Sequence, residues 1–252
     1  MNAFARSLVE AADPVALARR IGMEPDDWQR EVLRSAERRV WLCCHRQAGK
    51  SSVAALAGMH AALYEPGSLI LIFAPSQRQA TEVFRTCLRI YRSMSRPVAP
   101  EAENALSLSL ENGSRIVSLP GDEKTVRGYS AARLIIVDEA ARVSDELFVA
   151  VRPILAVSGG RLLVMSTPFG KRGWFYEASR QSGWARWTVP ATECARISPE
   201  FLAEERASMG DWMFRQEYLC EFVDTMSSFF DGDDISRAFA AGVERLRPEV
   251  AA

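Results

Sequence analysis

The sequence predicts an α/β fold in which helices cover a mainly parallel β-sheet. Short apolar runs alternate with longer segments of helical pattern, which is typical of successive strand–helix–strand units. Most of these runs are apolar at every position, as expected of strands that are buried on both faces. The chain has 252 residues, 48% of them hydrophobic, so it is long enough to bury one sizeable core.

The expected elements follow one another in a regular order. After a helical N-terminal segment over about residues 1–39, we expect strands at Val40–Cys44, Leu69–Ala74, Arg115–Leu119, Leu134–Val137, Leu162–Ser166 and Trp187–Val189. Between them we expect helices at Ser51–Leu63, Gln77–Ser93, Ser144–Leu155 and Lys171–Arg180. The core of the domain therefore extends over about residues 40–190.

An Asn112-Gly113 pair lies between the apolar runs Leu106–Leu110 and Arg115–Leu119. Asn-Gly between two such runs is a hairpin signal, because both residues tolerate the positive φ of a tight turn. We therefore expect a short antiparallel insert in the sheet.

Two helices are expected after the core, as a C-terminal helical subdomain over about residues 191–224. Ser198 followed by Pro199 is a helix start signal, and Asp211 is placed to cap a second helix that runs to about Phe222. Residues 225–252 are expected to be a linker or tail.

Composition excludes several classes of protein. The formal net charge of −1 does not fit a globally basic nucleic-acid coat. No apolar run approaches the roughly 20 residues of a membrane helix, and the N-terminus lacks the pattern of a signal peptide. The five cysteines form no C-x-x-C pair, which favours free thiols in a reducing compartment. We therefore expect a cytoplasmic protein without membrane contact.

The first motif with specific chemistry follows the strand Val40–Cys44. It reads His-Arg-Gln-Ala-Gly-Lys-Ser over residues 45–51, before a helix. The backbone N–H groups of such a loop can wrap a polyphosphate, while Lys50 reaches the β and γ phosphates and Ser51 ligates Mg²⁺. Cys44 occupies the place of the usual first glycine, so an ordinary strand–turn–helix is the alternative. The candidate nucleotide-binding residues of the loop are Gln47, Ala48, Gly49, Lys50 and Ser51.

A second motif ends the apolar strand Leu134–Val137. Asp138 and Glu139 come directly after it, at the carboxyl end where α/β sheets bind ligands. Asp138 is placed to hold Mg²⁺ through water, and Glu139 to orient and deprotonate the water that attacks a γ-phosphate. A solvated acidic pair at a turn is the alternative.

A third strand ends in Ser166-Thr167-Pro168. Its two hydroxyls lie at the same rim of the sheet, where they can sense whether a γ-phosphate is present. Together the three motifs predict a three-layer α/β/α P-loop NTPase of the RecA-like (ASCE) kind, with a mainly parallel central sheet.

The three motifs, together with segments around them, resemble the large terminase subunit of tailed bacteriophages, and the resemblance extends from about Asp26 to Phe230. The resemblance rests on an arginine and a glutamine before the Gly-Lys-Ser sequence, and on five further segments: Trp28-Gln29, Ala74-Pro75-Ser76, Arg127-Gly128, Asp138-Glu139 and Ser166-Thr167-Pro168. It implies that Gln29 binds the adenine base and that Ser166 and Thr167 form the coupling motif.

The resemblance also implies catalytic roles. Glu139 would be the catalytic base, Arg46 a candidate arginine finger in cis, and Arg127 a candidate finger that reaches a neighbouring subunit. An arginine that meets the developing charge accelerates such reactions by about 10³ to 10⁵. The alternatives are an ion pair that anchors the loop for Arg46, and a loop contact with Asp122 or Glu123 for Arg127.

The implied activity is ATP hydrolysis with Mg²⁺ that drives double-stranded DNA into a viral capsid. The implied partners are double-stranded DNA, further copies of the chain in a ring on the capsid portal, and the small terminase subunit, in a bacterial host cytoplasm. This family usually continues into a nuclease domain, and only 23 residues follow Phe229. We therefore expect no nuclease domain, which leaves a separately encoded nuclease as a further partner.

Two other functions stay open at this point. A helicase-like DNA-dependent ATPase carries similar Asp-Glu-Ala and Ser-Thr-Pro segments. A non-hydrolysing nucleotide-binding adaptor, such as a prophage remnant, would explain the missing nuclease. Residues 150–190 combine arginines with Trp174, Phe175, Tyr176, Trp184 and Trp187, a pattern of nucleic-acid binding or simply of core packing.

Overall fold

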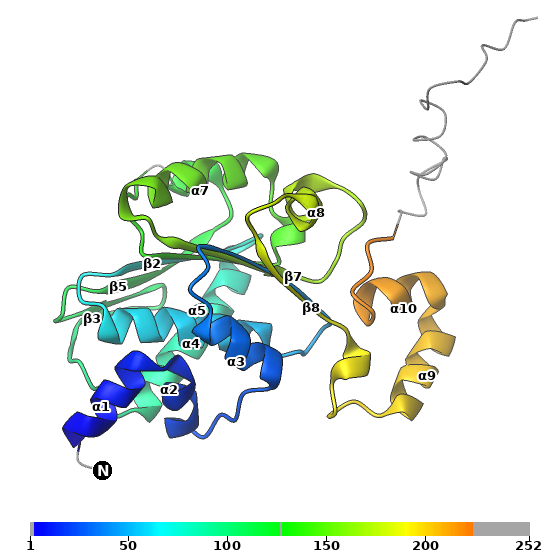
Figure 1. Cartoon of the computed structure of the whole chain (residues 1–252). Coiled ribbons are helices and arrows are strands. Elements are labelled where there is room, and N and C mark those ends of the chain that lie inside the picture. Colours follow the sequence, from blue (N-terminus) through cyan, green and yellow to red (C-terminus); the bar gives the residue numbers. More distant parts are fainter. Residues whose placement is uncertain (1–2, 127, 224–252) are drawn as a thin grey trace, which may run out of the picture.

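An eight-stranded β-sheet forms the middle layer of the fold, with helices on both faces (Figure 1). The computed structural model describes residues 3–126 and 128–223. In chain order the strands are β1 (Arg39–Cys44), β2 (Leu69–Ala74), β3 (Pro100–Glu103), β4 (Ser107–Leu110), β5 (Arg115–Pro120), β6 (Leu134–Asp138), β7 (Arg161–Ser166) and β8 (Ala185–Val189). Their order across the sheet is β3-β4-β5-β2-β6-β7-β1-β8.

The six strands from β5 to β8 run parallel, and β3 and β4 add an antiparallel edge. This confirms the mainly parallel α/β fold of the P-loop, RecA-like kind. One strand, β7, separates β1 from β6, and the register pairs Cys43 with Ser166 and Asp138 with Met165. The three predicted motifs therefore end side by side at the carboxyl edge of the sheet.

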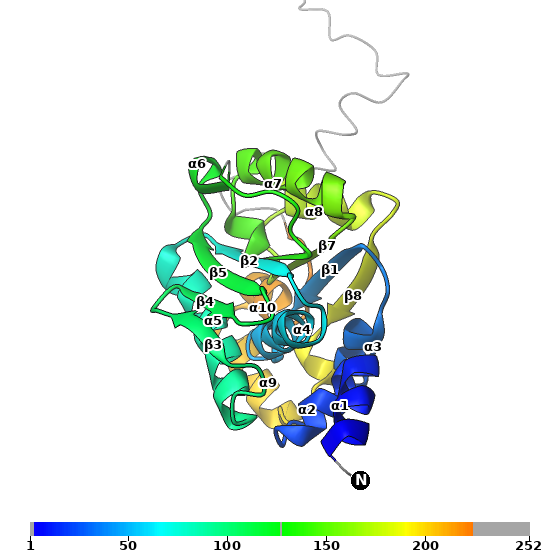
Figure 2. The same ribbon diagram turned by 90° about the vertical axis from the view of Figure 1, so that its left-hand side faces the viewer.

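One face of the sheet is covered by α1 (Ala3–Ala12), α2 (Pro14–Arg20), α3 (Asp27–Arg34), α4 (Lys50–Tyr64) and α5 (Gln77–Ser93) (Figures 1 and 2). The other face is covered by α6 (Glu123–Val126), α7 (Asp145–Ser158) and α8 (Gly173–Arg180). At the carboxyl ends of the strands stand α9 (Pro199–Met209) and α10 (Asp211–Glu217). No helix in these described parts of the chain is long and apolar enough to cross a membrane.

Strand side chains alternate between two hydrophobic cores. In β1, Val40, Leu42 and Cys44 pack under α4 and α5, whereas Trp41 and Cys43 pack under α7 and α8. Because successive strand residues point to opposite faces, a strand buried on both sides must be apolar throughout. The uninterrupted apolar runs of the sequence have this cause.

Two predicted elements differ from the structure. The antiparallel insert has three strands, because the polar segment Pro100–Glu103 pairs with β4 as an edge strand. The last helix ends at Glu217 and not at about Phe222. Beyond it the chain turns at Cys220, with φ of 59°, and the Phe222 ring packs on Trp41 with centroids 6.2 Å apart. Tertiary packing therefore ends this helix early.

Asp211 does not cap α10. It is the first residue of the helix, Gly210 precedes it, and no side-chain hydrogen bond caps this end. The carboxylate of Asp211 instead accepts a hydrogen bond from Arg206 Nε at 2.8 Å. The Asp211 carboxylate, which the predicted cap needs as an acceptor, therefore binds Arg206 of α9 instead.

Candidate nucleotide-binding and catalytic site

The loop between β1 and α4 has the backbone of a phosphate-binding loop. Gly49, the residue before the helix, has φ of 89°, and Gln47 has φ of 64°. Within the described chain, no hydrogen bond engages the backbone amides of Gly49, Lys50 or Ser51. Free N–H groups at a helix N-terminus form a site for an anion. The loop therefore offers donors to a phosphate group.

Gly49 is required for a second reason. A Cβ atom at this position would lie 2.8 Å from Nε2 of Gln29 in α3. Gln29 is 4% exposed, donates from Nε2 to the carbonyl oxygen of Ala48 at 3.3 Å, and accepts from the N–H of Asp26 at 3.0 Å. The predicted base-binding residue thus lies against the phosphate loop, with both amide atoms engaged within the protein.

A cavity of about 680 Å³ opens beside this contact and is lined by Trp28, His45, Ala48, Cys194 and Arg196, among others. Arg196 closes one side by a bidentate ion pair with Asp26, with both N···O distances 2.8 Å. The cavity is large enough for an aromatic ligand. Gln29 does not line it, so base recognition by Gln29 stays a prediction.

Lys50 and Glu139 meet across the site. Lys50 Nζ lies 3.0 Å from Glu139 Oε1, and the two side chains are 12% and 21% exposed. Burial lowers the pKa of Lys50, but the carboxylates of Glu139 and Asp138 outweigh this effect, so the pKa is raised above its ordinary value. A charged lysine is therefore held where the loop amides converge.

Asp138 and Ser51 form the group of oxygen atoms predicted to hold Mg²⁺. The Ser51 hydroxyl donates to Asp138 Oδ2 at 3.4 Å. Burial raises the pKa of Asp138 to about 6, against the opposing charge of Lys50. One hydroxyl and one carboxylate fit Mg²⁺, which takes few protein ligands and completes its shell with phosphate oxygens and water. No cluster of three His, Cys, Asp or Glu side chains in the described residues offers an alternative metal site.

The backbone at Glu139 is left-handed, with φ of 49° and ψ of 42°. A non-glycine residue in this region is strained, and such strain is concentrated at functional sites. The Glu139 N–H donates to Asp138 Oδ1 at 2.9 Å. The two adjacent carboxylates have different side-chain partners, Lys50 for Glu139 and Ser51 for Asp138.

The end of β7 lies between these groups. Ser166 is fully buried, and its Oγ has no hydrogen-bond partner among the described residues. Thr167 Oγ1 accepts from Arg142 Nη1 at 3.3 Å, and the same Nη1 donates to Glu139 Oε2 at 3.1 Å. Arg142 was not predicted from the sequence. The only signal for it is its position three residues after Glu139, the spacing of a possible ion pair.

Arg46 forms its ion pair outside the candidate catalytic carboxylates. Its guanidinium pairs with Glu217 at the end of α10, and Gln216, the residue before, accepts from the N–H of Gly170 at 3.4 Å. The phosphate loop and the segment after β7 therefore both contact α10. The arrangement matches the anchoring ion pair that was the alternative to a finger role. The second candidate finger, Arg127, lies outside the described residues.

Three of the six aromatic side chains of residues 150–190 are buried in the core. Trp174, Phe175 and Trp184 are at most 7% exposed, and Trp174 stacks on Phe148 with ring centroids 4.5 Å apart. These rings are not available for base stacking. For these three residues, core packing is the correct interpretation of the basic and aromatic pattern.

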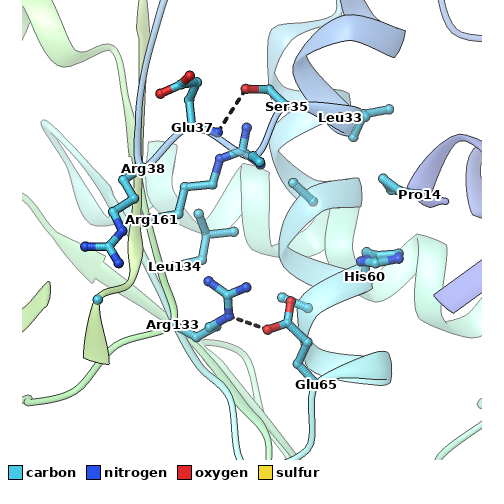
Figure 3. A pocket seen from close by; sticks show the side chains of 14 residues that line it. Pro14, Leu33, Ser35, Glu37, Arg38, His60, Glu65, Arg133, Leu134 and Arg161 are labelled. Carbon is cyan, nitrogen blue, oxygen red and sulfur yellow. Dashed lines mark hydrogen bonds and ion pairs between the residues drawn. The ribbon is translucent and has the colours of Figure 1, made fainter. Parts of the chain in front are cut away.

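A second cavity, of about 410 Å³, opens at the amino ends of the parallel strands (Figure 3). Arg38, Arg133 and Arg161 line it, but Arg133 pairs with Glu65, and Arg161 Nη2 donates to the carbonyl oxygen of Val32 at 3.0 Å. No predicted site residue lines this cavity.

Comparison with known proteins identifies the family of the chain. Residues 45–237 match the family described as terminase large subunit, T4likevirus-type, N-terminal. The terminase large subunits of Thermus phage G20c and Thermus virus P23-45 are each 30% identical to this chain, over 85% of it and 52% of their own length. The chain therefore spans about half the length of these curated relatives.

Solved structures of large terminases also resemble this chain. The large terminase ATPase domain of Thermus phage P74-26 superposes with a TM-score of 0.73 at 26% identity, over 82% of this chain and 97% of that domain. The large terminase of another thermophilic bacteriophage, in complex with ADP, gives 0.62 at 12% identity, over 82% of this chain and 53% of the other, a likeness of fold alone. Given the family match over most of its residues, the chain belongs to the terminase large subunit family and has the fold of its ATPase domain.

Proposed function

We propose that this chain hydrolyses ATP with Mg²⁺ and that hydrolysis drives the translocation of double-stranded DNA, as in packaging into a capsid. The observation that carries the proposal is the convergence of Lys50, Ser51, Asp138 and Glu139 at the carboxyl ends of β1 and β6. The match with terminase ATPase domains supports it, as does the structure of a related terminase bound to ADP.

The residues of the loop bind and orient the nucleotide. The free amides before and at the start of α4 donate to phosphate oxygens, and Lys50 supplies a positive charge to the β and γ phosphates. Ser51 and Asp138 would hold Mg²⁺, which neutralises the charge that develops on the phosphates.

Glu139 is the candidate general base. Its Oε1 lies 3.0 Å from Lys50 Nζ. A γ-phosphate competes with Glu139 for Lys50, and that exchange frees Oε1 to accept a proton from an attacking water. Binding of the substrate therefore activates the base that acts on it.

DNA translocation, assembly of a ring on a capsid portal and contact with a small terminase subunit follow from the family and belong to this proposal. Arg127 as a finger toward a neighbouring subunit belongs here too. Arg46 can act as an arginine finger in cis only if nucleotide binding breaks its ion pair with Glu217.

The test is steady-state ATPase activity with and without double-stranded DNA, for the wild type, Lys50→Ala and Glu139→Gln. We expect Glu139→Gln to lower kcat by about 10² to 10⁴, the range for loss of a general base, and Lys50→Ala to lower the rate as well, because it removes the positive charge that meets the phosphates. DNA stimulation should weaken steeply as salt rises, because phosphate contacts release counterions. Equal rates in all three proteins would refute the proposal. Nucleotide binding without turnover would favour the adaptor, and duplex unwinding would favour the helicase-like ATPase.

A further inference from the structure

Arg142 lies in the short helical turn η1 (Ala140–Arg142) that follows Glu139 directly. Its Nη1 is 3.1 Å from Glu139 Oε2 and 3.3 Å from Thr167 Oγ1. One guanidinium group therefore joins the candidate catalytic base to the end of β7, two segments that are far apart in the sequence.

Three further features hold Arg142 in place. Its backbone N–H donates to the carbonyl oxygen of Glu139 at 2.9 Å, and its guanidinium carbon lies 4.7 Å from the centroid of the Phe169 ring. The side chain is 28% exposed, so water screens it only in part. A guanidinium that stacks on a ring while donating two hydrogen bonds has little freedom to rotate.

The two oxygens of Glu139 have different partners. Lys50 holds Oε1 at 3.0 Å and Arg142 holds Oε2 at 3.1 Å. Lys50 comes from the phosphate loop and is the group that a nucleotide would draw away. Arg142 comes from the turn after Glu139 and contacts Thr167 and Phe169, and none of its contacts within the described residues is with the phosphate loop.

We propose that Arg142 is the positioning residue of Glu139: it holds one carboxylate oxygen so that the other faces the attacking water once Lys50 has turned to the phosphates. This inference rests on the proposed ATPase function. Without Arg142 the carboxylate would follow Lys50 or turn toward solvent, and a misplacement of about 1 Å can lower a rate about 100-fold.

The experiment compares ATP hydrolysis and ADP binding in the wild type, Arg142→Gln and Arg142→Lys. For Arg142→Gln we expect kcat to fall about 100-fold, while KM and the Kd for ADP stay within about twofold, because Arg142 contacts Glu139, Thr167 and Phe169 and not the phosphate loop. Lysine keeps the charge but loses the planar fork, so Arg142→Lys should recover part of the lost rate.

A matched control is available on α5. Arg85 also pairs with a glutamate three residues before it, with Nη1 2.7 Å from Glu82 Oε1, but this pair is exposed and on a helix outside the site. Arg85→Gln should leave kcat within about twofold of the wild type. A second test uses Glu139→Gln as the background, where adding Arg142→Gln should lower the residual rate by less than about twofold if Arg142 acts through Glu139.

The outcomes separate the two proposals. A wild type without turnover overturns the proposed function and this inference with it. An active wild type with an unchanged kcat in Arg142→Gln overturns only the inference. The inference also fails if Arg142→Gln weakens ADP binding as much as it lowers kcat, or if its full effect persists in the Glu139→Gln background, because either result indicates a general structural role.

Discussion

Replacing Asp138 by asparagine should stabilise the nucleotide-free protein at neutral pH while abolishing hydrolysis. Asp138 is 7% exposed, and burial raises its pKa from 3.8 to about 6. Asparagine has nearly the shape of the protonated acid, and its Oδ1 can still accept the hydrogen bond that the Glu139 N–H donates at 2.9 Å. The substitution therefore removes the buried charge and keeps the local contact.

The magnitude follows from the pKa shift. The folded-state pKa lies above the unfolded-state value, so between about pH 4 and pH 6 the folded protein binds more protons, and its stability falls as the pH rises. A shift of about two units corresponds to roughly 3 kcal/mol. Above pH 6 the free energy of unfolding of Asp138→Asn should therefore exceed that of the wild type by up to about 3 kcal/mol. For a domain of this size this corresponds to a Tm higher by about 6 to 12 °C.

The assay is thermal unfolding followed by circular dichroism over pH 4 to 8. The difference in Tm between Asp138→Asn and the wild type should be largest near pH 8 and disappear toward pH 4. Glu139→Gln is the control, because it removes the adjacent carboxylate but leaves Lys50 and Arg142 without their partner. It should lower Tm. An Asp138→Asn protein that melts at or below the wild-type temperature at pH 8 would refute the reasoning.

Two further predictions concern the phosphate loop and the thiols. Gly49→Ala should lower Tm more than Gly22→Ala does. Both glycines have positive φ, but only at Gly49 would the new Cβ meet another residue, Gln29 Nε2 at 2.8 Å. Equal decreases in Tm would mean that this contact does not affect stability. Burial raises the pKa of Cys87 to about 12. A hydrogen bond with Cys220, together with burial, raises the pKa of Cys43 well above its ordinary value, whereas Cys194 is partly exposed. Ellman's reagent should therefore react rapidly with one thiol in the native protein, and Cys194→Ser should abolish this rapid reaction. A rapid phase that remains in the Cys194→Ser protein would contradict the assignment.

Much of the fold could be predicted because its signals are local. A strand buried on both faces must be apolar at every position, so β1, β2 and β6 could be recognised one at a time. The motifs at the strand ends were equally local, and in a parallel sheet the carboxyl ends meet at one edge. That rule predicts that the phosphate loop and the acidic pair lie at the same edge of the sheet.

The elements that were missed lack such signals. The edge strand β3 is the polar segment Pro100–Glu103, whose pairing depends on β4 rather than on its own residues. The helix α10 ends early because Phe222 packs on Trp41, a residue of β1. The ion pair of Arg46 joins residues 171 positions apart, and no spacing in the chain indicates it.

Local sequence therefore determined the parts of this protein whose chemistry lies within a few residues: the buried strands, the glycine-dependent phosphate loop and the acidic pair after β6. Only the tertiary structure decided which partners those parts meet. The position of β7 between β1 and β6 brings Thr167 to Arg142, and the return of the chain after β8 brings Glu217 to Arg46. The physical reason is the sequence separation of the interacting residues. Backbone conformation and burial pattern depend on neighbours in the chain, whereas ion pairs and side-chain packing join residues that only the folded chain brings close together.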